Sequence, residues 1–242
     1  MINQQTLIIG ANSNIAKALV DQIQQYSNVG LILISRDLSD YSQIDNLQKI
    51  TVQDYQPETI SATVERLSRD RLKPITQVFI CNGILHNSNI QPEKRLEELN
   101  AQSFQQVIAI NALLPMLWIQ QLTPLLASKS PCKIIVFSAR VGSINDNKLG
   151  GWYSYRASKA ALNMMLKTVA IELARRAKNI KIIAFHPGTT DTPLSKPFQR
   201  NVPPEKLFPC DFVAKQLLAI TKKTEVDGSA SYLDWQGNTI DW

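Results

Sequence analysis

A tyrosine and a lysine four residues apart, Tyr155 and Lys159, are the pair whose types and spacing best suit chemistry. They lie in a pattern typical of a helix from Trp152 to about Arg176, where this spacing places both side chains on one face. A nearby ammonium favours the phenolate and should lower the tyrosine pKa from its usual value near ~10. Such a phenol can protonate a carbonyl oxygen while hydride reaches the carbon. The same spacing arises by chance in many helices, so other features must support this interpretation.

A turn of small residues follows the first apolar segment, at residues 10–16. A turn of this kind before a helix lets a pyrophosphate approach backbone N–H groups and the helix N-terminus. It is a degraded glycine motif, because its second and third small positions are Asn14 and Ala16. A plain strand-to-helix turn with a Ser or Asn cap is the alternative interpretation.

The second apolar segment ends in Ser35 and Arg36. An acidic residue at such a strand end would bind a ribose 2′-hydroxyl and repel a 2′-phosphate. A hydroxyl and a guanidinium instead suit a 2′-phosphate through charge-assisted hydrogen bonds. The pair therefore favours NADP(H) over NAD(H). The alternative is a surface Arg36 paired with Asp37 or Asp40.

Apolar segments alternate with amphipathic segments along the whole chain. This alternation predicts an α/β fold: one doubly wound parallel sheet of about seven strands, Rossmann-type, with helices on both faces and ligands at the carboxyl ends of the strands. We expect one domain over residues 1–242, because no linker or repeat interrupts the pattern. The expected strands are 6–9, 30–34, 51–52, 78–81, 133–137, 180–185 and 230–233, and the expected helices are 14–25, 59–72, 103–126 (with a bend at Pro115), 152–176 and 211–221.

Composition narrows the function classes. The net charge of +6 is spread along the chain, which argues against nucleic-acid binding. The sequence shows neither the charged and apolar regions of a signal peptide nor an apolar run long enough to span a bilayer, so we expect no membrane partner. Three cysteines in or beside apolar runs fit reduced thiols and a cytoplasmic location. The two histidines, His86 and His186, have no third ligand nearby, so no metal site is expected.

With these motifs placed, the chain resembles the short-chain dehydrogenase/reductases over essentially its whole length. The residues that carry the likeness are Gly10 to Ala16, Asp54, Cys81 to Gly83, Asn111, Tyr155 with Lys159, and Pro187 to Thr192. Within the family the chain is most similar to the C-factor group, which includes the sniffer-type carbonyl reductases. That closer likeness rests on residues 83–86, 140–144, 150–153 and 234–237.

The resemblance implies a role for each matching residue. Tyr155 would be the general acid in reduction and the base in oxidation, Lys159 would lower its pKa and hold the nicotinamide ribose, and Asn111 would anchor a water that relays protons to Lys159. Asp54 would bind the adenine amino group. The residues implied in cofactor binding are Gly10, Asn12, Ser13, Asn14, Ile15, Ser35, Arg36, Asp54, Tyr55, Asn82, Gly83, Tyr155, Lys159, Pro187, Gly188, Thr190 and Thr192.

The sequence departs from the family pattern at the catalytic serine. The family often has Ser-Ser-x-x-Gly after the fifth strand, and the second serine holds the substrate oxygen. Here Ala139 takes that place. Ser138 or Ser143 could reach the oxygen instead, and we assign Ser138 as the fourth catalytic residue. A second departure is Ile80-Cys81-Asn82-Gly83, where the family usually has Asn-Asn-Ala-Gly.

The expected function is an NADP(H)-dependent oxidoreductase that moves hydride between nicotinamide and a small-molecule carbonyl or hydroxyl compound. The alternative is a nucleotide-binding signalling or regulatory protein with little turnover, which Ala139 and the imperfect glycine turn favour. By resemblance the chain should form a homodimer or homotetramer. Residues 192–204, with Leu194 and Phe198 as apolar points, are either a lid over the substrate or an ordinary surface loop.

Overall fold

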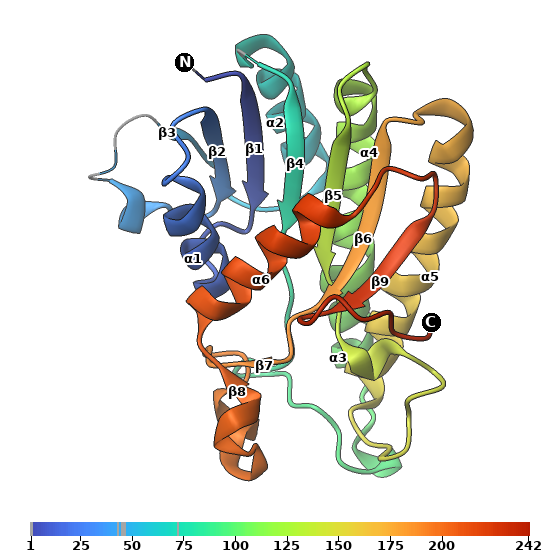
Figure 1. The fold of residues 1–242 in the computed structure, drawn as a ribbon. Helices are drawn as coiled ribbons and strands as arrows, with labels where there is room; N and C mark the ends of the chain where they lie inside the picture. The colour runs from blue at the N-terminus through green and yellow to red at the C-terminus, as the bar shows by residue number, and fades with distance from the viewer. Residues whose placement is uncertain (1, 43, 45–46, 72) are drawn as a thin grey trace.

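The computed structural model describes residues 2–42, 44, 47–71 and 73–242. Seven parallel strands form one sheet in the order β3-β2-β1-β4-β5-β6-β9, and two short strands, β7 and β8, pair separately. The strand order reverses between β1 and β4, so a crevice opens there at the carboxyl ends of the strands, at the lower edge in Figure 1. The strands are β1 Gln4–Ile9, β2 Val29–Ser35, β3 Leu47–Thr51, β4 Ile75–Ile80, β5 Cys132–Phe137, β6 Ile180–His186, β7 Thr189–Thr190, β8 Leu207–Phe208 and β9 Ala230–Asp234.

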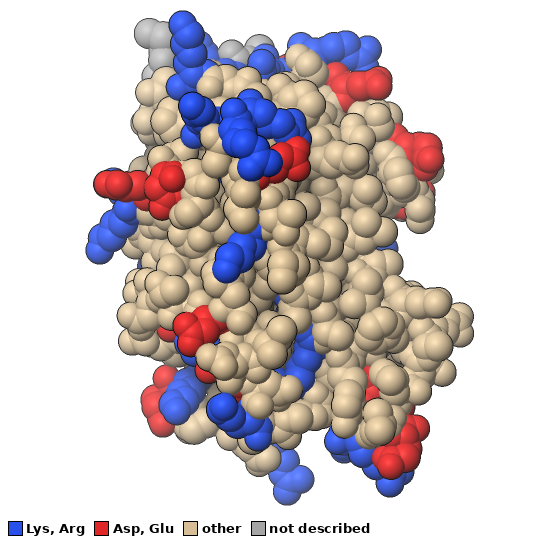
Figure 2. Space-filling view, turned by 90° about the vertical axis from the view of Figure 1, so that its right-hand side faces the viewer, with Lys and Arg blue, Asp and Glu red and all other residues tan. Residues whose placement is uncertain are grey.

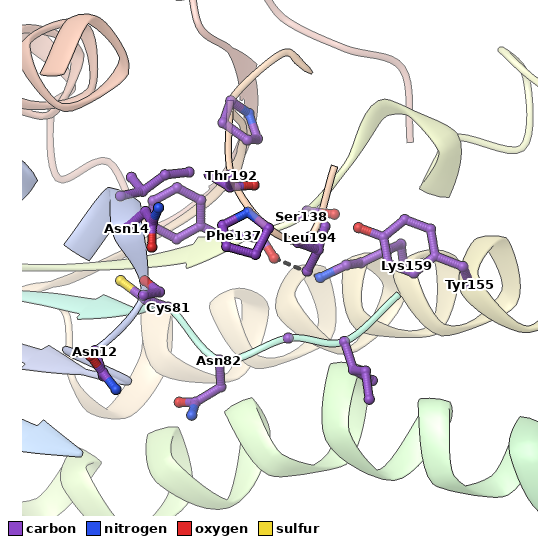
Figure 3. Close-up of a pocket in the computed structure, with 16 residues that line it drawn as sticks. Asn12, Asn14, Cys81, Asn82, Phe137, Ser138, Tyr155, Lys159, Thr192 and Leu194 are labelled. Carbon is purple, nitrogen blue, oxygen red and sulfur yellow. Dashed lines mark hydrogen bonds between the residues drawn. The ribbon is translucent and has the colours of Figure 1, made fainter. Parts of the chain in front are cut away.

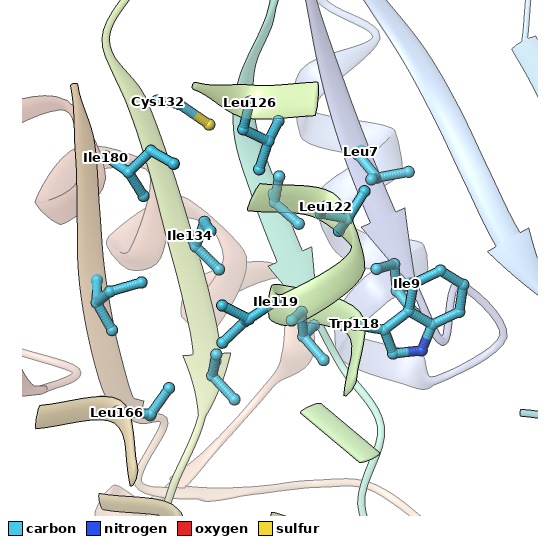
Figure 4. Packing of buried hydrophobic residues seen from close by; sticks show 14 of the residues in the cluster. Leu7, Ile9, Trp118, Ile119, Leu122, Leu126, Cys132, Ile134, Leu166 and Ile180 are labelled. Carbon is cyan, nitrogen blue, oxygen red and sulfur yellow. The ribbon is translucent and has the colours of Figure 1, made fainter. Parts of the chain in front are cut away.

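Helices cover both faces of the sheet, as the alternating pattern predicts. Helices α1 and α6 lie in front of the sheet in Figure 1, and α2, α4 and α5 lie behind it. Figure 4 shows the rear layer, where Trp118 and Leu122 of α4 pack against Ile9 of β1 and its neighbours. Because strands buried on both faces are apolar there, β1, β4 and β5 end in the apolar runs Leu7–Ile9, Val78–Ile80 and Ile134–Phe137. The helices are α1 Asn14–Ile23, α2 Pro57–Asp70, α3 Ala101–Ile108, α4 Leu114–Leu126, α5 Tyr153–Arg176 and α6 Cys210–Lys223.

The predicted long helix at 103–126 is interrupted by a π-helical turn over Ala109–Leu113. The irregularity ends two residues before Pro115, which lies in the first turn of α4, and the expected bend at Pro115 stays a prediction. By length and composition, residues 101–126 could cross a membrane, which the sequence argument overlooked. Half of the most apolar window is buried in the protein, where α4 packs on the sheet.

Several element boundaries differ from expectation, and β3 and α2 are two examples. The third strand is β3, Leu47–Thr51, and not residues 51–52. It is an edge strand on which Gln48 and Lys49 stay partly exposed, so the apolar pattern is weak there. Helix α2 begins at Pro57, two residues before the expected start, and the expected end at Leu72 lies outside the described residues.

The surface charge is dispersed on the face that Figure 2 shows. Lys and Arg side chains lie there in small separate groups with Asp and Glu between them, and most of the face carries neither. This arrangement agrees with the spread of basic residues along the chain.

Candidate active site

The crevice at the β1–β4 switch point is lined by the turn after β1 and the segment after β4. Gly10 has a positive φ of 75°, and a Cβ there would lie 3.1 Å from the Asn82 backbone nitrogen. Glycine therefore lets the two segments approach closely. Ser13 caps α1 by accepting a hydrogen bond from the Ala16 amide, 3.3 Å away. The turn is thus a capped strand-to-helix connection and also one wall of the crevice.

A cavity of about 360 Å³ extends from this turn to the start of α5. Figure 3 shows Asn12, Asn14 and Cys81 at one end of it and Ser138, Tyr155 and Lys159 at the other. The structure therefore brings the turn after β1 and the Tyr-Lys pair, about 140 residues apart in the chain, into one site. The lining residues are Asn12, Ser13, Asn14, Ile15, Cys81, Asn82, Gly83, Ile84, Phe137, Ser138, Tyr155, Lys159, Pro187, Thr192, Pro193 and Leu194.

The Tyr155 and Lys159 side chains are neighbours on α5, as their spacing predicts. The Lys159 Nζ atom lies 5.7 Å from the Tyr155 ring centroid and donates a hydrogen bond to the Phe137 carbonyl at 2.9 Å. Burial lowers the pKa of Lys159 to about 8. Burial also raises the pKa of Tyr155, and the Tyr232 phenol adds to the rise. The expected lowering of the tyrosine pKa is therefore not found, because removal from water disfavours both charged forms.

Of the two serines proposed to replace the missing hydroxyl at Ala139, only Ser138 lines the cavity. Its Oγ donates to the Asn163 Oδ1 atom at 2.6 Å, and 4% of its surface is exposed. Ser143 is buried beside the Asp146 amide, whose hydrogen bond it accepts, and it lies outside the cavity walls. Ala139 itself contributes a methyl group to an adjoining cavity.

Two predicted site residues, Asn111 and Asp54, are not among the residues that line the cavities. Asn111 is fully buried: its Oδ1 accepts from the Ile84 amide at 2.7 Å, and its Nδ2 donates to the Ile84 carbonyl at 2.8 Å and to Ser158 Oγ at 3.0 Å. Its side chain anchors the segment after β4 to α5, and the relay to Lys159 stays a prediction. Asp54 accepts from the Gln56 amide and the Thr59 hydroxyl at the start of α2; these bonds lower its pKa.

A more open cavity beside the glycine turn is lined by Ser35, Arg36 and Tyr55. The Arg36 guanidinium lies over the Tyr55 ring, 5.6 Å from its centroid. Within the described ranges Arg36 makes no ion pair. Asp37 accepts from the Ser39 amide at 2.9 Å, and Asp40 pairs with Lys17. The alternative in which Arg36 is a surface residue paired with Asp37 or Asp40 is therefore wrong.

A second cavity of about 370 Å³ adjoins the first on the other side of Tyr155. Its walls are largely apolar and aromatic, and Trp152 and Phe198 pack edge to face, 5.0 Å apart. The segment predicted as a lid or a surface loop forms one wall through Leu194, Phe198 and Val202. The remaining lining residues are Ile15, Leu85, Ser138, Ala139, Arg140, Val141, His186, Pro187, Gly188, Thr189, Thr190, Thr192 and Ser195.

The charged side chain in this second cavity, Arg140, is neutralised. It pairs with Asp146 at 2.9 Å and with Asp234 at 3.2 Å. Burial and the Arg140 charge lower the pKa of the neighbouring His186 to about 4, so this imidazole is neutral at pH 7. The other histidine, His86, contacts the Leu194 carbonyl at 3.1 Å and the Phe198 ring. No group of three metal-ligating side chains occurs among the residues that the structure describes.

Sequence reasoning missed the residues that hold the start of α5. Trp152 precedes the helix in the left-handed region, with φ of 53°, and provides no side-chain cap. The cap comes from Glu93, 61 residues before Ser154: its buried carboxylate accepts hydrogen bonds from the Ser154 amide, at 3.1 Å, and from the Ser154 hydroxyl. The Glu93 carbonyl also accepts from the Trp152 amide. A capping pattern within the helix sequence could not reveal this long-range contact.

Comparison with known proteins agrees with this geometry. The family model described as short chain dehydrogenase matches residues 3–203. The chain belongs to the short-chain dehydrogenase/reductase family. This short-chain dehydrogenase/reductase is 28% identical over 192 residues, 79% of this chain and 80% of the relative, to 1-hydroxy-2-glutathionyl-2-methyl-3-butene dehydrogenase from Rhodococcus. It is 26% identical over 147 residues to C-signal from Myxococcus xanthus, covering 61% of this chain and 83% of that protein.

Solved structures share the fold of this short-chain dehydrogenase/reductase. The NADPH-bound carbonyl reductase from chicken fatty liver superposes with a TM-score of 0.84 at 21% identity over both whole chains. Carbonyl reductase Sniffer of D. melanogaster gives 0.83 at 20% identity, also over both whole chains. At these identities the likeness establishes the fold, and the expected kinship with the C-factor and sniffer group is confirmed by these relatives together.

Proposed function

We propose that this short-chain dehydrogenase/reductase is an NADP(H)-dependent carbonyl reductase that uses Tyr155 as its acid. The observation that carries the proposal is the meeting of Tyr155, Lys159 and Ser138 in one cavity with the glycine turn. The cavity fits a dinucleotide, because Asn82 lines it and the Asn82 Oδ1 atom is buried without a hydrogen-bond partner among the described residues. An incoming ribose or adenine group would supply the missing donor.

In reduction, bound NADPH supplies the hydride that reaches the carbonyl carbon. Tyr155 gives its proton to the carbonyl oxygen and returns from phenolate to phenol by taking a proton from solvent. Its raised pKa keeps the phenol protonated at neutral pH, which is the form that reduction needs. Lys159, whose Nζ atom lies 5.7 Å from the Tyr155 ring centroid, would stabilise the transient phenolate and bind the nicotinamide ribose hydroxyls.

The preference for NADP(H) rests on Arg36. Its guanidinium is held by Tyr55 and free of ion pairs in the described part of the chain, while Asp37 is engaged with the Ser39 amide. A 2′-phosphate beside Ser35 would therefore meet an uncompensated positive charge. We expect Arg36→Ala to weaken NADPH binding about 10- to 100-fold, the value of one or two charge-assisted hydrogen bonds, and to leave NADH binding unchanged.

The matched control is Arg69→Ala, because Arg69 is exposed on α2. Binding is measured by titrating cofactor fluorescence. Equal weakening of NADPH and NADH binding by Arg36→Ala, or faster turnover of the wild type with NADH than with NADPH, would refute the assignment.

The second cavity supports an uncharged, partly apolar carbonyl compound as substrate. Trp152, Phe198 and Leu85 offer apolar surface, and the one arginine there is paired with two aspartates. A substrate carboxylate would have to displace an existing ion pair. We expect aldehydes, ketones and quinones without a charge to be reduced faster than their carboxylated analogues.

Tyr155→Phe tests the chemistry directly. The variant should bind NADPH normally and lose measurable NADPH oxidation with the best substrate of a panel of aldehydes, ketones and quinones. Tyr153→Phe is the matched control, because Tyr153 lies one half-turn away and is exposed. Retained turnover in Tyr155→Phe would remove Tyr155 from the mechanism.

A signalling or regulatory protein with little turnover is the second candidate function, and Ala139 favours it because the hydroxyl of the family pattern is absent. The similarity to C-signal is one of sequence and does not by itself indicate a signalling role. Tight NADPH binding by the wild type without reduction of any compound in the panel would favour this candidate over the reductase.

We also propose a cytoplasmic homo-oligomer. Leu113, Met164 and Ile171 expose about half or more of their surface beside α4 and on α5, and a second subunit would cover such side chains. The free thiols Cys81 and Cys132 fit a reducing compartment. Light scattering of the purified protein tests the oligomeric state, and a monomer at micromolar concentration would refute the proposed homo-oligomer.

A further inference from the structure

Three consecutive residues before α5 have left-handed backbone conformations. Gly150 and Gly151 each have φ of 65°, and Trp152 follows with φ of 53° and ψ of 43°. Glycine enters this region freely, whereas any other residue pays a steric cost because its Cβ crowds the following carbonyl oxygen. Trp152 is the one non-glycine residue with a positive φ in the described part of the chain. A third glycine would remove this cost, so the reason for tryptophan lies in its side chain.

Hydrogen bonds from two directions hold the strained turn in place. The Trp152 amide donates to the Glu93 carbonyl, in the segment after β4. The Arg156 guanidinium donates to the Gly151 carbonyl at 2.9 Å and to the Gly150 carbonyl at 3.1 Å. Backbone strain persists only where the surroundings over-determine it, and it is concentrated at functional sites. The backbone that carries the indole is therefore fixed relative to α5.

The indole of Trp152 stands between the proposed acid and the segment that borders the substrate cavity. Its ring centroid lies 6.0 Å from that of Tyr155 and 5.0 Å from that of Phe198, and both pairs meet edge to face. All three side chains line the second cavity. Phe198 belongs to the short 3₁₀-helical segment Lys196–Asn201. The cavity thus has one aromatic wall that is pinned beside Tyr155 and a facing aromatic wall that a separate surface segment supplies.

We propose that Trp152 is a specificity-determining residue: its indole limits the size of the group on the substrate carbonyl, and the left-handed backbone is maintained to hold the indole there. This inference rests on the proposed reductase function and deepens it by naming the wall that selects the substrate. With the cofactor in the first cavity, the substituents of a carbonyl compound bound at Tyr155 extend into the second, which the indole borders. A tryptophan with a purely structural role would stabilise the fold without affecting the choice of substrate.

Trp152→Gly tests the size limit, with two uncharged methyl ketones as probes. Acetophenone carries one aromatic ring on its carbonyl, and 2-acetylnaphthalene carries two fused rings. The wild type should prefer acetophenone. Removing the indole makes room for the additional ring, so the ratio of kcat/KM for 2-acetylnaphthalene to kcat/KM for acetophenone should rise about tenfold or more, the scale on which apolar pockets respond to a change of size. Acetophenone loses a contact remote from the reacting atoms, so its KM should rise while its kcat changes little.

Trp152→Ala separates the side chain from the backbone. It also removes the indole and should give a similar ratio, but its Cβ keeps the left-handed strain. Trp152→Gly should therefore melt about 2–4 °C above Trp152→Ala. Trp152→Phe keeps one of the two fused rings and should give an intermediate ratio. The matched control is Tyr153→Ala, which removes the neighbouring ring outside the cavity and should keep the wild-type ratio.

NADPH titration checks that each variant is folded, and if Trp152→Gly binds no cofactor, the ratio in Trp152→Phe decides. A ratio that stays at the wild-type value or falls in the variants that lack the indole would overturn the proposal and leave the reductase function intact. A Trp152→Ala protein that melts no earlier than Trp152→Gly would overturn the role of backbone strain. A wild type that reduces no carbonyl compound would instead refute the proposed function, while the two melting temperatures would still decide whether the backbone at Trp152 is strained.

Discussion

The cap that Glu93 places on α5 is the contact most open to a quantitative test. Glu93→Ala removes a carboxylate that accepts from the Ser154 amide and hydroxyl and leaves both donors buried. Losing a helix N-cap costs about 0.5–2 kcal/mol, and each hydrogen bond to a charged group contributes about 1.5–3 kcal/mol. Because these losses overlap, we expect the free energy of unfolding to fall by about 3 kcal/mol.

In a chain of this size 1 kcal/mol shifts the melting temperature by about 2–4 °C, so Glu93→Ala should lower Tm by about 6–12 °C. Glu93→Gln keeps one acceptor oxygen and loses the charge that favours the helix N-terminus, so we expect about half of this shift. Tyr155 is the third residue of α5, and fraying of that turn should also reduce kcat.

Thermal unfolding followed by circular dichroism measures the shift, with Glu97→Ala as the control. Glu97 lies on the same segment, is exposed and carries the same charge. The reasoning is refuted if Glu93→Ala melts within about 1 °C of the wild type, or if Glu97→Ala melts as early as Glu93→Ala.

Three further changes have expected outcomes. A Cβ at Gly142 would lie 2.7 Å from the Lys159 Cβ atom. Gly142→Ala should therefore displace α5 and lower kcat at least tenfold, because a misplaced catalytic group costs about this much or more. Steady-state kinetics with NADPH measure the effect, and an unchanged kcat would contradict the prediction. The pKa of Lys159 is about 8 in the folded protein against about 10.4 unfolded, so the unfolded chain binds more protons between these values and wild-type stability rises with pH there. Lys159→Met should therefore be inactive but raise Tm at pH 7, and this gain should shrink between pH 8 and 10.5; a gain that persists at pH 10.5 would count against burial as the cause. The buried Lys181 ammonium lies 2.6 Å from the Asp227 carboxylate. Burial raises the pKa of Asp227, but hydrogen bonds from Lys181 and Ser229 outweigh this effect and hold the pKa at about 2. This ion pair should stabilise the fold by on the order of 1 kcal/mol, because the carboxylate is half exposed, and the stabilisation is present above about pH 4 and is lost as the pH falls towards 2. Asp227→Asn should accordingly melt earlier than the wild type at pH 6 and at the same temperature as the wild type at pH 2.

The sequence predicts the sheet and the composition of the cofactor cavity well, because both depend on local patterns. Buried parallel strands must be continuous apolar runs, and ligands collect where those strands end. The third strand was misplaced because β3 lies at the sheet edge, where Gln48 and Lys49 remain partly exposed and blur the pattern.

The contacts that tune the site could not be predicted, because they join residues far apart in the chain. Glu93 and Ser154 are 61 residues apart, and nothing in either local sequence indicates the cap. The spacing of Tyr155 and Lys159 gave their proximity correctly but the wrong direction for the tyrosine pKa. Helical periodicity specifies which residues are neighbours and carries no information on how much water the fold leaves around them.

The π-helical turn at Ala109–Leu113 means that the backbone between α3 and α4 carries one surplus residue. Each residue of an α-helix advances the side-chain direction by about 100°. Deleting one residue from this turn would give an unbroken helix of ordinary pitch, yet it would rotate either Asn111 away from Ile84 or Trp118 away from the sheet. Homologues should therefore tolerate substitutions around this turn far more readily than a single-residue deletion within it.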